Sequence, residues 1–375
     1  MEVFLDNAST TPLLPEVKEM LRCTLDIYGN PSSIHSKGIE TKKIITQSRD
    51  NVAKFIGADY GKIVFTPSGS ASNMIMINTF SGVKGGERRI FYIPTAHKSI
   101  VNHAKTIGAI PLPIYSTGEI DIKSTEKMFS ILKHYHIAPL VISEYANSEI
   151  GTVQDVFTLT NLVHKYNGLI YLDCTGAVSS TPINVQKIEA DAIGFSGHKI
   201  GALKGVGVLW YNDDAIIPFP LINGSQEGGI VGGTENLLGI ISVGASVKYY
   251  RHSENTERNR NYVQNWITEN ISDVLVVGKN SKRRLDGNLN ICFKGVSGEA
   301  LLLLLDSMGI QVSTGSACNS GSKSPSGVLK AIKFPEKYIH SCIRMSFSGN
   351  ETQEQLDCVC QCLKICVQRL RKGNK

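Results

Sequence analysis

Short apolar segments rich in β-branched residues recur between residues 62 and 212, and helix-like stretches separate most of them. These segments do not alternate polar with apolar residues, which is typical of strands that are covered on both faces. Seven strands are predicted in this way, at residues 63–66, 90–94, 110–115, 140–145, 169–173, 192–196 and 206–211. Strands that alternate with helices predict an α/β fold, with a mostly parallel seven-stranded sheet covered by helices.

The pattern changes after a glycine-rich stretch at residues 228–233. A long polar helix is predicted near 243–270, and shorter strands then alternate with helices, which indicates a second, smaller α+β domain. Its predicted strands are at 288–293, 311–314 and 343–347. Three parts are therefore predicted: an N-terminal segment at 1–15 that packs on the others, a large domain at 16–250 and a small domain at 251–375.

The composition argues against several classes of protein. The most apolar run, residues 301–305, is far too short to cross a bilayer, and the first residues do not resemble an export signal. We therefore expect a cytoplasmic protein that does not bind membranes. The formal net charge is +6, with small basic clusters at 282–284 and 369–372. Solvated surface charge is the favoured interpretation of these clusters, so no direct contact with nucleic acid is expected.

Nine cysteines without a disulfide-scaffold pattern predict reduced thiols in such a protein. Near the C-terminus, Cys358, Cys362 and Cys366 recur at every fourth residue of a predicted helix. They are interpreted as small buried hydrophobic residues, because their spacing is not that of a zinc site. No metal site is predicted.

Two polar residues follow neighbouring buried strands. Lys199 comes shortly after the strand at 192–196, beyond Gly197 and His198, and lysine can form a Schiff base with an aldehyde cofactor. Asp173 ends the strand at 169–173, where its carboxylate could pair with the ring nitrogen of pyridoxal 5′-phosphate (PLP). Ligands bind at the carboxyl ends of strands in α/β sheets. For each residue alone an ordinary cap is the favoured interpretation, but the two residues together make a cofactor site competitive.

Two loops lie just beyond other predicted strands. Gly69 and Ser70 belong to a Gly- and Ser-rich loop ahead of a helix predicted to start near Met74, and free N–H groups there suit a phosphate. The loop matches neither a Walker loop nor a dinucleotide fingerprint, which disfavours nucleotides. His97 follows the strand at 90–94 and could stack on a ring and move protons. A helix cap and a hydrogen-bonded loop histidine are the alternatives.

Two residues in the second half of the chain are candidates for substrate chemistry. Cys318 lies among glycines and serines at 315–322, which favours an exposed, reactive thiol over a buried one. Arg344, on the predicted strand 343–347, could hold the carboxylate of an amino acid with two parallel hydrogen bonds. A surface salt bridge is an equally good interpretation of Arg344.

Together these residues resemble those of the cysteine desulfurases of the NifS/IscS type, which are class V aminotransferases and fold-type I PLP enzymes. The resemblance covers nearly the whole chain, and its matching segments are 6–12, 29–35, 149–155, 196–199 and 315–318. It implies a PLP-dependent enzyme that converts L-cysteine to L-alanine. It also implies a homodimer that carries the sulfur on Cys318 as a persulfide, for an iron–sulfur scaffold or another acceptor protein.

The resemblance implies a role for each matching residue. Lys199 is similar to the lysine that binds the cofactor aldehyde, Asp173 to the partner of the ring nitrogen, and His97 to the stacking histidine. The remaining positions match contacts to the cofactor: Gly69, Ser70, Asn147, Ser196 and His198.

Three further matches concern the substrate and the dimer. Asn30 and Arg344 are similar to the residues that contact the substrate carboxylate. Thr234 is similar to the residue that reaches the phosphate in the partner subunit.

Four positions depart from the family pattern. Ser148 and Gly176 stand where the family usually has Asn and Gln, and Ala71 and Met74 replace polar residues after the phosphate loop. These departures keep two alternatives open. One is a class V lyase or aminotransferase that acts on another amino acid, and the other is a degenerate PLP-fold protein that binds a partner.

Overall fold

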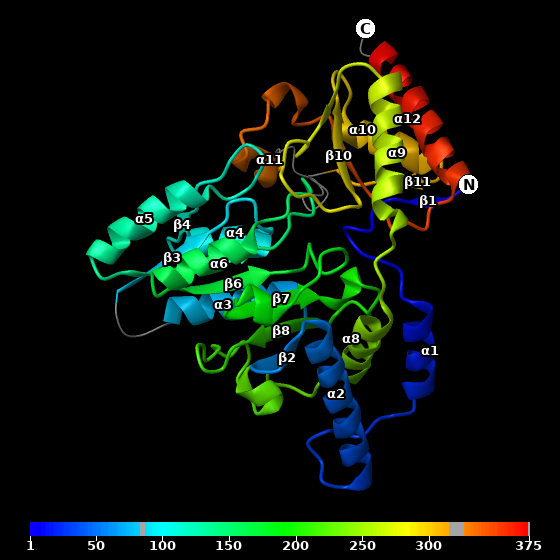
Figure 1. The fold of residues 1–375 in the computed structure, drawn as a ribbon. Helices are drawn as coiled ribbons and strands as arrows, with labels where there is room; N and C mark the ends of the chain where they lie inside the picture. Colours follow the sequence, from blue (N-terminus) through cyan, green and yellow to red (C-terminus); the bar gives the residue numbers. More distant parts are fainter. Residues whose placement is uncertain (83–86, 315–325, 374–375) are drawn as a thin grey trace.

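A seven-stranded sheet forms the centre of the computed structural model, which describes residues 1–82, 87–314 and 326–373 (Figure 1). The strand order is β2-β8-β7-β6-β5-β3-β4. The pairs among β3, β4, β5, β6 and β7 are parallel, and β8 is antiparallel to both of its neighbours. The strands are β2 (Lys62–Thr66), β3 (Arg88–Tyr92), β4 (Ile110–Pro111), β5 (Ala138–Glu144), β6 (Leu169–Asp173), β7 (Ala192–Ser196) and β8 (Gly207–Tyr211). The predicted α/β fold with a mostly parallel sheet is confirmed.

One predicted strand of this sheet is much shorter than expected. The segment at 110–115 contains β4, which pairs with β3 over two residues only. Pro111 and Pro113 lack the N–H groups that a longer ladder needs. The chain then turns back on itself, and the N–H of Tyr115 donates to the carbonyl oxygen of Glu119 (2.9 Å).

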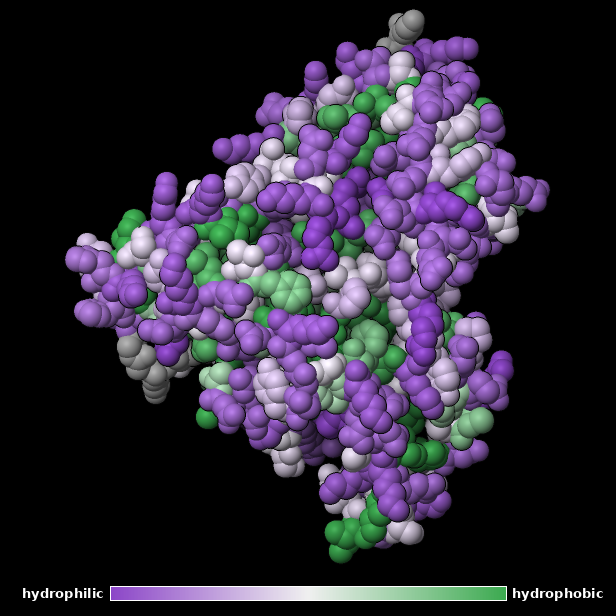
Figure 2. All heavy atoms as spheres, in the orientation of Figure 1, coloured by the Kyte–Doolittle hydropathy of each residue, from purple (hydrophilic) through white to green (hydrophobic). Residues whose placement is uncertain are grey.

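Helices pack around the central sheet, and several of them carry polar caps at their N-termini. The side chains of Asp121, Asp155 and Asn236 each accept a hydrogen bond from an N–H group in the first turn of the helix that follows. The helices are α1 (Pro15–Thr24), α2 (Ser36–Phe55), α3 (Gly69–Gly82), α4 (Lys98–Thr106), α5 (Ile122–His134), α6 (Val156–Lys165), α7 (Val185–Ile188) and α8 (Leu237–Tyr249). The connection between α1 and α2 forms the lower end of the molecule, where Figure 2 shows apolar side chains on the surface.

A second hydrophobic core lies in the C-terminal third of the chain. It surrounds an antiparallel sheet in the order β12-β10-β9 and includes Val3 and Leu5 from the N-terminal segment. That segment also pairs with this region through β1 (Val3–Phe4), which is parallel to β11 (Ile310–Gln311). The other elements are β9 (Val274–Val276), β10 (Asn288–Phe293), β12 (Cys342–Ser346), α9 (Asn255–Asn270), α10 (Gly298–Ser307), α11 (Gly327–Ala331) and α12 (Gln353–Gly373).

The prediction of one long helix near 243–270 is wrong. Two helices, α8 and α9, occupy this region, and residues 250–254 separate them. Tyr250 ends α8 with extended backbone torsions, and its hydroxyl group donates to the carbonyl oxygen of Ser179 (2.7 Å). This tertiary contact directs the chain away from the helix axis. The domain boundary predicted at residue 250 lies in the same break and stays a prediction.

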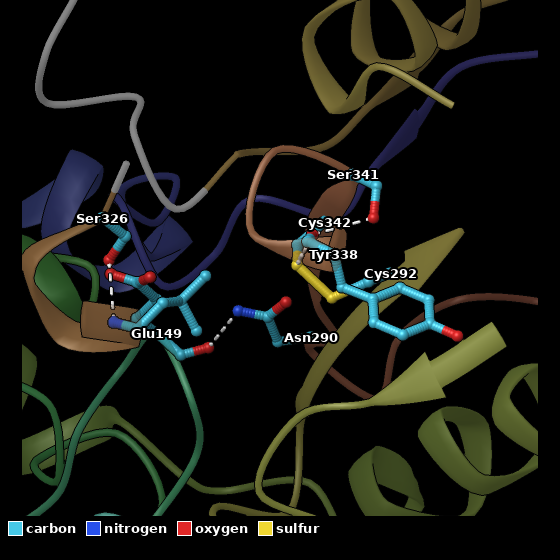
Figure 3. Close-up of a disulfide and its surroundings, with 8 residues drawn as sticks. Glu149, Asn290, Cys292, Ser326, Tyr338, Ser341 and Cys342 are labelled. Carbon is cyan, nitrogen blue, oxygen red and sulfur yellow. Dashed lines mark hydrogen bonds between the residues drawn. A yellow bond between two sulfur atoms is a disulfide. The ribbon is translucent and has the colours of Figure 1, made fainter. Parts of the chain in front are cut away.

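The expectation that all cysteines are reduced is wrong for one pair. Cys292 on β10 and Cys342 on β12 form a disulfide, drawn in Figure 3. They are directly opposite each other in the antiparallel pair, with Cα atoms 3.8 Å apart. Such positions bring side chains close together. The 50 residues that separate the two cysteines hide this pairing in the sequence.

The C-terminal cysteines lie on the predicted helix, which is confirmed as α12. Cys366 is buried, as expected, whereas Cys358 and Cys362 lie at the edge of the packed face and are half-buried. Cys360, outside the predicted stripe, is also buried. Among the described residues, no group of three or more His, Cys, Asp and Glu side chains is placed to hold a metal ion. The helices in the described ranges are all too short or too polar to span a membrane.

Candidate active site

Lys199 and Asp173 lie at the same edge of the central sheet. Asp173 is the last residue of β6, and Lys199 ends the short 3₁₀ turn Gly197–Lys199 that follows the parallel neighbour β7. The Lys199 ammonium group donates hydrogen bonds to the carbonyl oxygens of Ala8 and Ser9. The predicted convergence of the two strand ends is therefore present, and the N-terminal segment contacts the lysine.

The Asp173 carboxylate is buried and held by two donors. Nδ2 of Asn73 on α3 donates to one oxygen (2.8 Å), and the N–H of Thr175 donates to the other (2.9 Å). The hydroxyl group of Tyr171 donates to Oδ1 of Asn73 (2.6 Å) and so orients its amide. This network keeps a negative charge at a fixed position, as the protonated ring nitrogen of PLP requires. Sequence reasoning did not find Asn73, because its pairing with Asp173 spans 100 residues.

The phosphate loop is more compact than predicted. Helix α3 begins at Gly69 rather than near Met74, so Gly69 and Ser70 form its first turn. A Cβ atom on Gly69 would lie 2.8 Å from Oγ1 of Thr175 and 3.3 Å from Cβ of Ser196. Close packing of this kind requires glycine.

A buried hydroxyl group adds to the same loop. Oγ1 of Thr175 is shielded from solvent and has no hydrogen-bond partner among the described residues. Next to it are the N–H groups of Gly69 and Ser70 at the start of α3, which have no acceptor among the described residues and favour an anion, whereas those of Ala71 and Ser72 donate to Ser68. The residues present therefore fit a phosphate group, and with Lys199 and Asp173 they fit PLP. Thr175 was not predicted, although its position two residues after Asp173 was a usable signal.

His97 is linked to Asp173 through two intermediate residues. It caps α4, where its Nδ1 accepts a hydrogen bond from the N–H of Ser99 (3.2 Å). Oγ of Ser99 in turn accepts one from Asn73, which binds Asp173. The His97 side chain is exposed on one side, but burial of the rest lowers its pKa. The negative charge of Asp173 opposes this shift, and the positive charge of Lys199 reinforces it. His97 is therefore largely neutral near pH 7 and able to accept a proton.

His198 lies between Lys199 and the N-terminal segment. Its Nδ1 is 3.1 Å from Oγ1 of Thr10, and its carbonyl oxygen accepts hydrogen bonds from Thr11. Partial burial, with the positive charges of Lys199 and Lys204, lowers the pKa of His198 to about 4. The imidazole is therefore neutral at physiological pH.

The geometry gives no support to the prediction that Asn147 contacts the cofactor. Its amide group donates to the carbonyl oxygen of Thr95 (2.7 Å) and to Glu144, and its Oδ1 accepts the N–H groups of Glu149 and Ile150. All of its hydrogen-bonding capacity is thus used by Thr95 after β3, by Glu144 at the end of β5 and by the turn that follows β5. Glu144 is a second buried carboxyl group that the sequence did not indicate. Burial raises the pKa of Glu144 to about 7, although hydrogen bonds from Thr95 and Asn147 oppose the shift.

Arg344 is buried, so the interpretation as a surface salt bridge is wrong. It lies on β12, and its Nη2 donates to Oδ1 of Asp6 (2.8 Å) and to Oγ of Ser9 (2.8 Å). Nη1 is 3.5 Å from the carbonyl oxygen of Ser148. Ser9 therefore contacts both Arg344, through its hydroxyl group, and Lys199, through its carbonyl oxygen. The N-terminal segment brings these two predicted site residues together.

Two of the predicted residues, Asn30 and Thr234, do not join this cluster within one chain. Cys318 lies outside the described residues. Asn30 is in the exposed connection between α1 and α2, and Thr234 is exposed before α8. Within the described ranges, no hydrogen bond connects either residue to Lys199, Asp173 or Arg344.

The structure explains one of the four departures from the family pattern. A Cβ atom on Gly176 would lie 2.3 Å from the carbonyl oxygen of Ala146. A glutamine at this position would therefore require the backbone to move. Ser148 contributes its carbonyl oxygen, which accepts a hydrogen bond from Nδ2 of Asn288 (2.9 Å). Nothing in the structure explains Ala71 or Met74.

Comparisons with known proteins agree with this geometry. The sequence profile of the family "Aminotransferase class-V" matches residues 3–359. The chain is 35% identical over 385 residues to the cysteine desulfurase IscS of Dictyoglomus turgidum, covering 99% of this chain and 95% of that protein. A NifS-like protein of Rickettsia africae has a TM-score of 0.88 at 26% identity, covering 98% of this chain and all of that one. The structure of SspA in complex with cysteine has a TM-score of 0.79 at 25% identity, covering 93% and 99%.

These matches extend over nearly the whole length of each chain. They favour a cysteine desulfurase over a class V enzyme of another specificity and over a protein that only binds a partner. The chain belongs to the aminotransferase class-V family and, within it, to the cysteine desulfurases.

Proposed function

We propose that this protein removes sulfur from L-cysteine, releases L-alanine, and holds the sulfur on Cys318 as a persulfide for an acceptor protein. The observation that carries the proposal is the convergence of Lys199, Asp173 and Arg344 on one site. Arg344 offers a positive charge for the substrate carboxylate, and Lys199 an amine for the cofactor. The related SspA structure contains cysteine, which supports the substrate.

When bound, PLP supplies an aldehyde that reacts with amines and a ring that withdraws electrons from the substrate. Lys199 would hold the aldehyde, and Asp173 would keep the ring nitrogen protonated. The first turn of α3, with Gly69 and Ser70, would bind the phosphate together with the Thr175 hydroxyl group. Lys199 would also take the proton from the substrate Cα atom, because its amine becomes free when the substrate displaces it.

The transfer of sulfur from the substrate to Cys318 needs no further oxidant or reductant. The Cys318 thiolate attacks the substrate sulfur, an S–S bond forms, and the Cβ–S bond breaks. The electron pair of that bond goes to carbon, which takes up a proton and leaves as the methyl group of alanine. Carbon is reduced, and the Cys318 sulfur and the substrate sulfur, which together form the persulfide, are oxidised to match. His97, neutral near pH 7, would move the protons involved.

The substitution Cys318→Ala tests this assignment. We expect persulfide and sulfur transfer to fall by at least about a hundredfold, because the variant lacks the attacking thiolate, while PLP absorbance stays at the parent level. Alanine, persulfide and sulfide are measured after addition of cysteine to the purified holoenzyme. Cys23→Ala, which removes an exposed cysteine on α1, is the matched control and should keep parent activity. Sulfur transfer at the parent rate by Cys318→Ala would show that another residue carries the sulfur.

We further propose that the active form is a homodimer. The connection between α1 and α2 exposes Leu25 (66%), Tyr28 (79%) and Ile34 (94%), a local cluster that water solvates poorly (Figure 2). Asn30 lies in the same connection and Thr234 is also exposed, so a second copy is needed to bring either residue to a Lys199 site. Light scattering should give twice the monomer mass of 40.9 kDa. A monomeric, fully active protein would exclude this arrangement.

The acceptor protein, a role in iron–sulfur cluster assembly and the cytoplasmic location remain predictions from the sequence. The Cys318 assignment is the basis of the first two, because an acceptor must reach the persulfide.

A further inference from the structure

Glu149 lies in the turn after β5, and its backbone is held at both ends. Its N–H donates to Oδ1 of Asn147 (2.9 Å), and its carbonyl oxygen accepts a hydrogen bond from Nδ2 of Asn290 on β10 (3.0 Å). Ser326, which caps α11, hydrogen-bonds to the Glu149 carboxyl group, and Figure 3 shows the two side chains next to each other. The carboxyl oxygen Oε1 is shielded from solvent and has no hydrogen-bond partner among the described residues. A buried acceptor left open in this way requires an explanation.

Arg344 borders the same turn. It is directly opposite Asn290 in the β10–β12 pair, and its Nη1 is 3.5 Å from the carbonyl oxygen of Ser148, the residue before Glu149. Nε of Arg344 is also buried without a hydrogen-bond partner among the described residues. The Arg344 charge acts on Glu149, but these two described side chains form no direct ion pair. The acceptor Oε1 of Glu149 and the donor Nε of Arg344 thus both lack a hydrogen-bond partner among the described residues, on the same side of the site.

Glu149 can change its charge near neutral pH. Burial is the main influence and raises the pKa of Glu149 to about 7. The hydrogen bond from Ser326, the Arg344 charge and the charge of Lys98 on α4 oppose this rise. The carboxyl group is therefore neutral below about pH 7 and ionised above it.

Two other acidic groups act on the same network. Glu144 on β5 is buried, and the negative charges of Asp173 and Glu149 contribute to raising its pKa. Asp6 of the N-terminal segment forms an ion pair with Arg344 (2.8 Å). Asp6 is therefore the acid in direct contact with Arg344, whereas Glu144 interacts with Glu149 through its charge.

We propose that Glu149 is a positioning residue that controls how strongly Arg344 holds the carboxylate of the substrate. The inference rests on the proposed role of Arg344 as the substrate-carboxylate contact. An ionised Glu149 and an incoming carboxylate are like charges near one guanidinium group, in a region from which water is largely excluded. Substrate binding therefore favours the neutral form of Glu149, and binding weakens once Glu149 is ionised.

The test compares the parent holoenzyme with Glu149→Gln from about pH 6 to about pH 9, with KM and kcat measured for L-cysteine. Glutamine has nearly the same size and can accept the hydrogen bond from Ser326, but it does not titrate. Across this range, the parent KM should rise about tenfold relative to that of Glu149→Gln if the substrate shifts the Glu149 pKa by about one unit. The ratio of the two kcat values should stay constant, because Glu149 acts on binding through Arg344.

The titration of free cysteine affects both proteins equally, so its effect cancels in the ratio of their KM values at each pH. A ratio that does not change with pH overturns the inference. Glu336→Gln removes the charge of an exposed glutamate beyond α11 and should keep the parent profile. Glu149→Asp keeps a titratable carboxyl group and should keep a pH-dependent KM, so the test does not depend on the stability of one variant. A KM ratio of Glu149→Asp to Glu149→Gln that stays constant with pH also overturns it.

Arg344→Ala separates this inference from the proposed function. If Arg344→Ala leaves KM for cysteine unchanged, Arg344 is not the substrate-carboxylate contact, and its proposed role fails. If Arg344→Ala raises KM while the KM of Glu149→Gln follows the parent profile, only the inference about Glu149 fails.

Discussion

Lys199→Ala is expected to abolish alanine formation from L-cysteine, with a loss of at least about a thousandfold in kcat. The amine of Lys199 is both the proposed attachment point of the cofactor and the proposed base for the substrate Cα proton, so one substitution removes two functions. The site around it should survive, because Asp173 and Arg344 keep their own partners: Asn73 and Thr175 for the aspartate, and Asp6 and Ser9 for the arginine. The absorbance of lysine-bound PLP should disappear while the thermal unfolding midpoint changes little.

Two further variants make this prediction specific. Lys199→Arg keeps the positive charge and can still donate to the carbonyl oxygens of Ala8 and Ser9, but a guanidinium group does not act as a nucleophile at neutral pH. It should therefore be as inactive as Lys199→Ala. Lys204→Ala removes a nearby exposed charge and should retain activity. If Lys199→Arg forms alanine within about tenfold of the parent rate, the proposed role of the amine is wrong.

The sequence predicted the central strands where local composition is unambiguous. The strands that end at Asp173 and Ser196 match their predicted bounds, because uniformly apolar residues are followed directly by polar ones. The helix break at Tyr250 was missed, because it depends on a hydrogen bond to Ser179, 71 residues away. Local periodicity contains no information about such a contact.

In the candidate site, too, local sequence indicates some residues, whereas others are recognised only from distant contacts. Lys199 and Asp173 could be found because each follows a strand, whereas Asn73 and Thr175 are ordinary polar residues until the fold places them at Asp173. Their roles come from burial, which removes water as an alternative partner. Glu149 is a further example, since its position beside Arg344 depends on the packing of β10 against the turn after β5.

Asp173→Asn should lower kcat for alanine formation by about a hundredfold to about ten-thousandfold, while PLP stays bound. Asparagine has the same shape but no negative charge, so the ring nitrogen of the cofactor would lose its proton and withdraw electrons poorly. One of its two terminal atoms is also a donor, which would face either the amide of Asn73 or the N–H of Thr175. Loss of the Asp173 charge would further lower the pKa of His97, because that charge opposes the shift.

Asp191→Asn is a control that separates the effect of the Asp173 charge on the cofactor from the effect of a buried carboxylate on folding. Asp191 is also buried and accepts a hydrogen bond from a backbone N–H, that of Ile170 (2.8 Å), but its other partner is His164, away from the site. Asp191→Asn should lower the free energy of unfolding by about 1–3 kcal/mol and leave kcat unchanged. PLP methylated at its ring nitrogen carries a permanent positive charge, so it should restore part of the activity of Asp173→Asn. If the methylated cofactor gives no recovery and Asp191→Asn loses the same activity as Asp173→Asn, the carboxylate supports the fold rather than the ring charge.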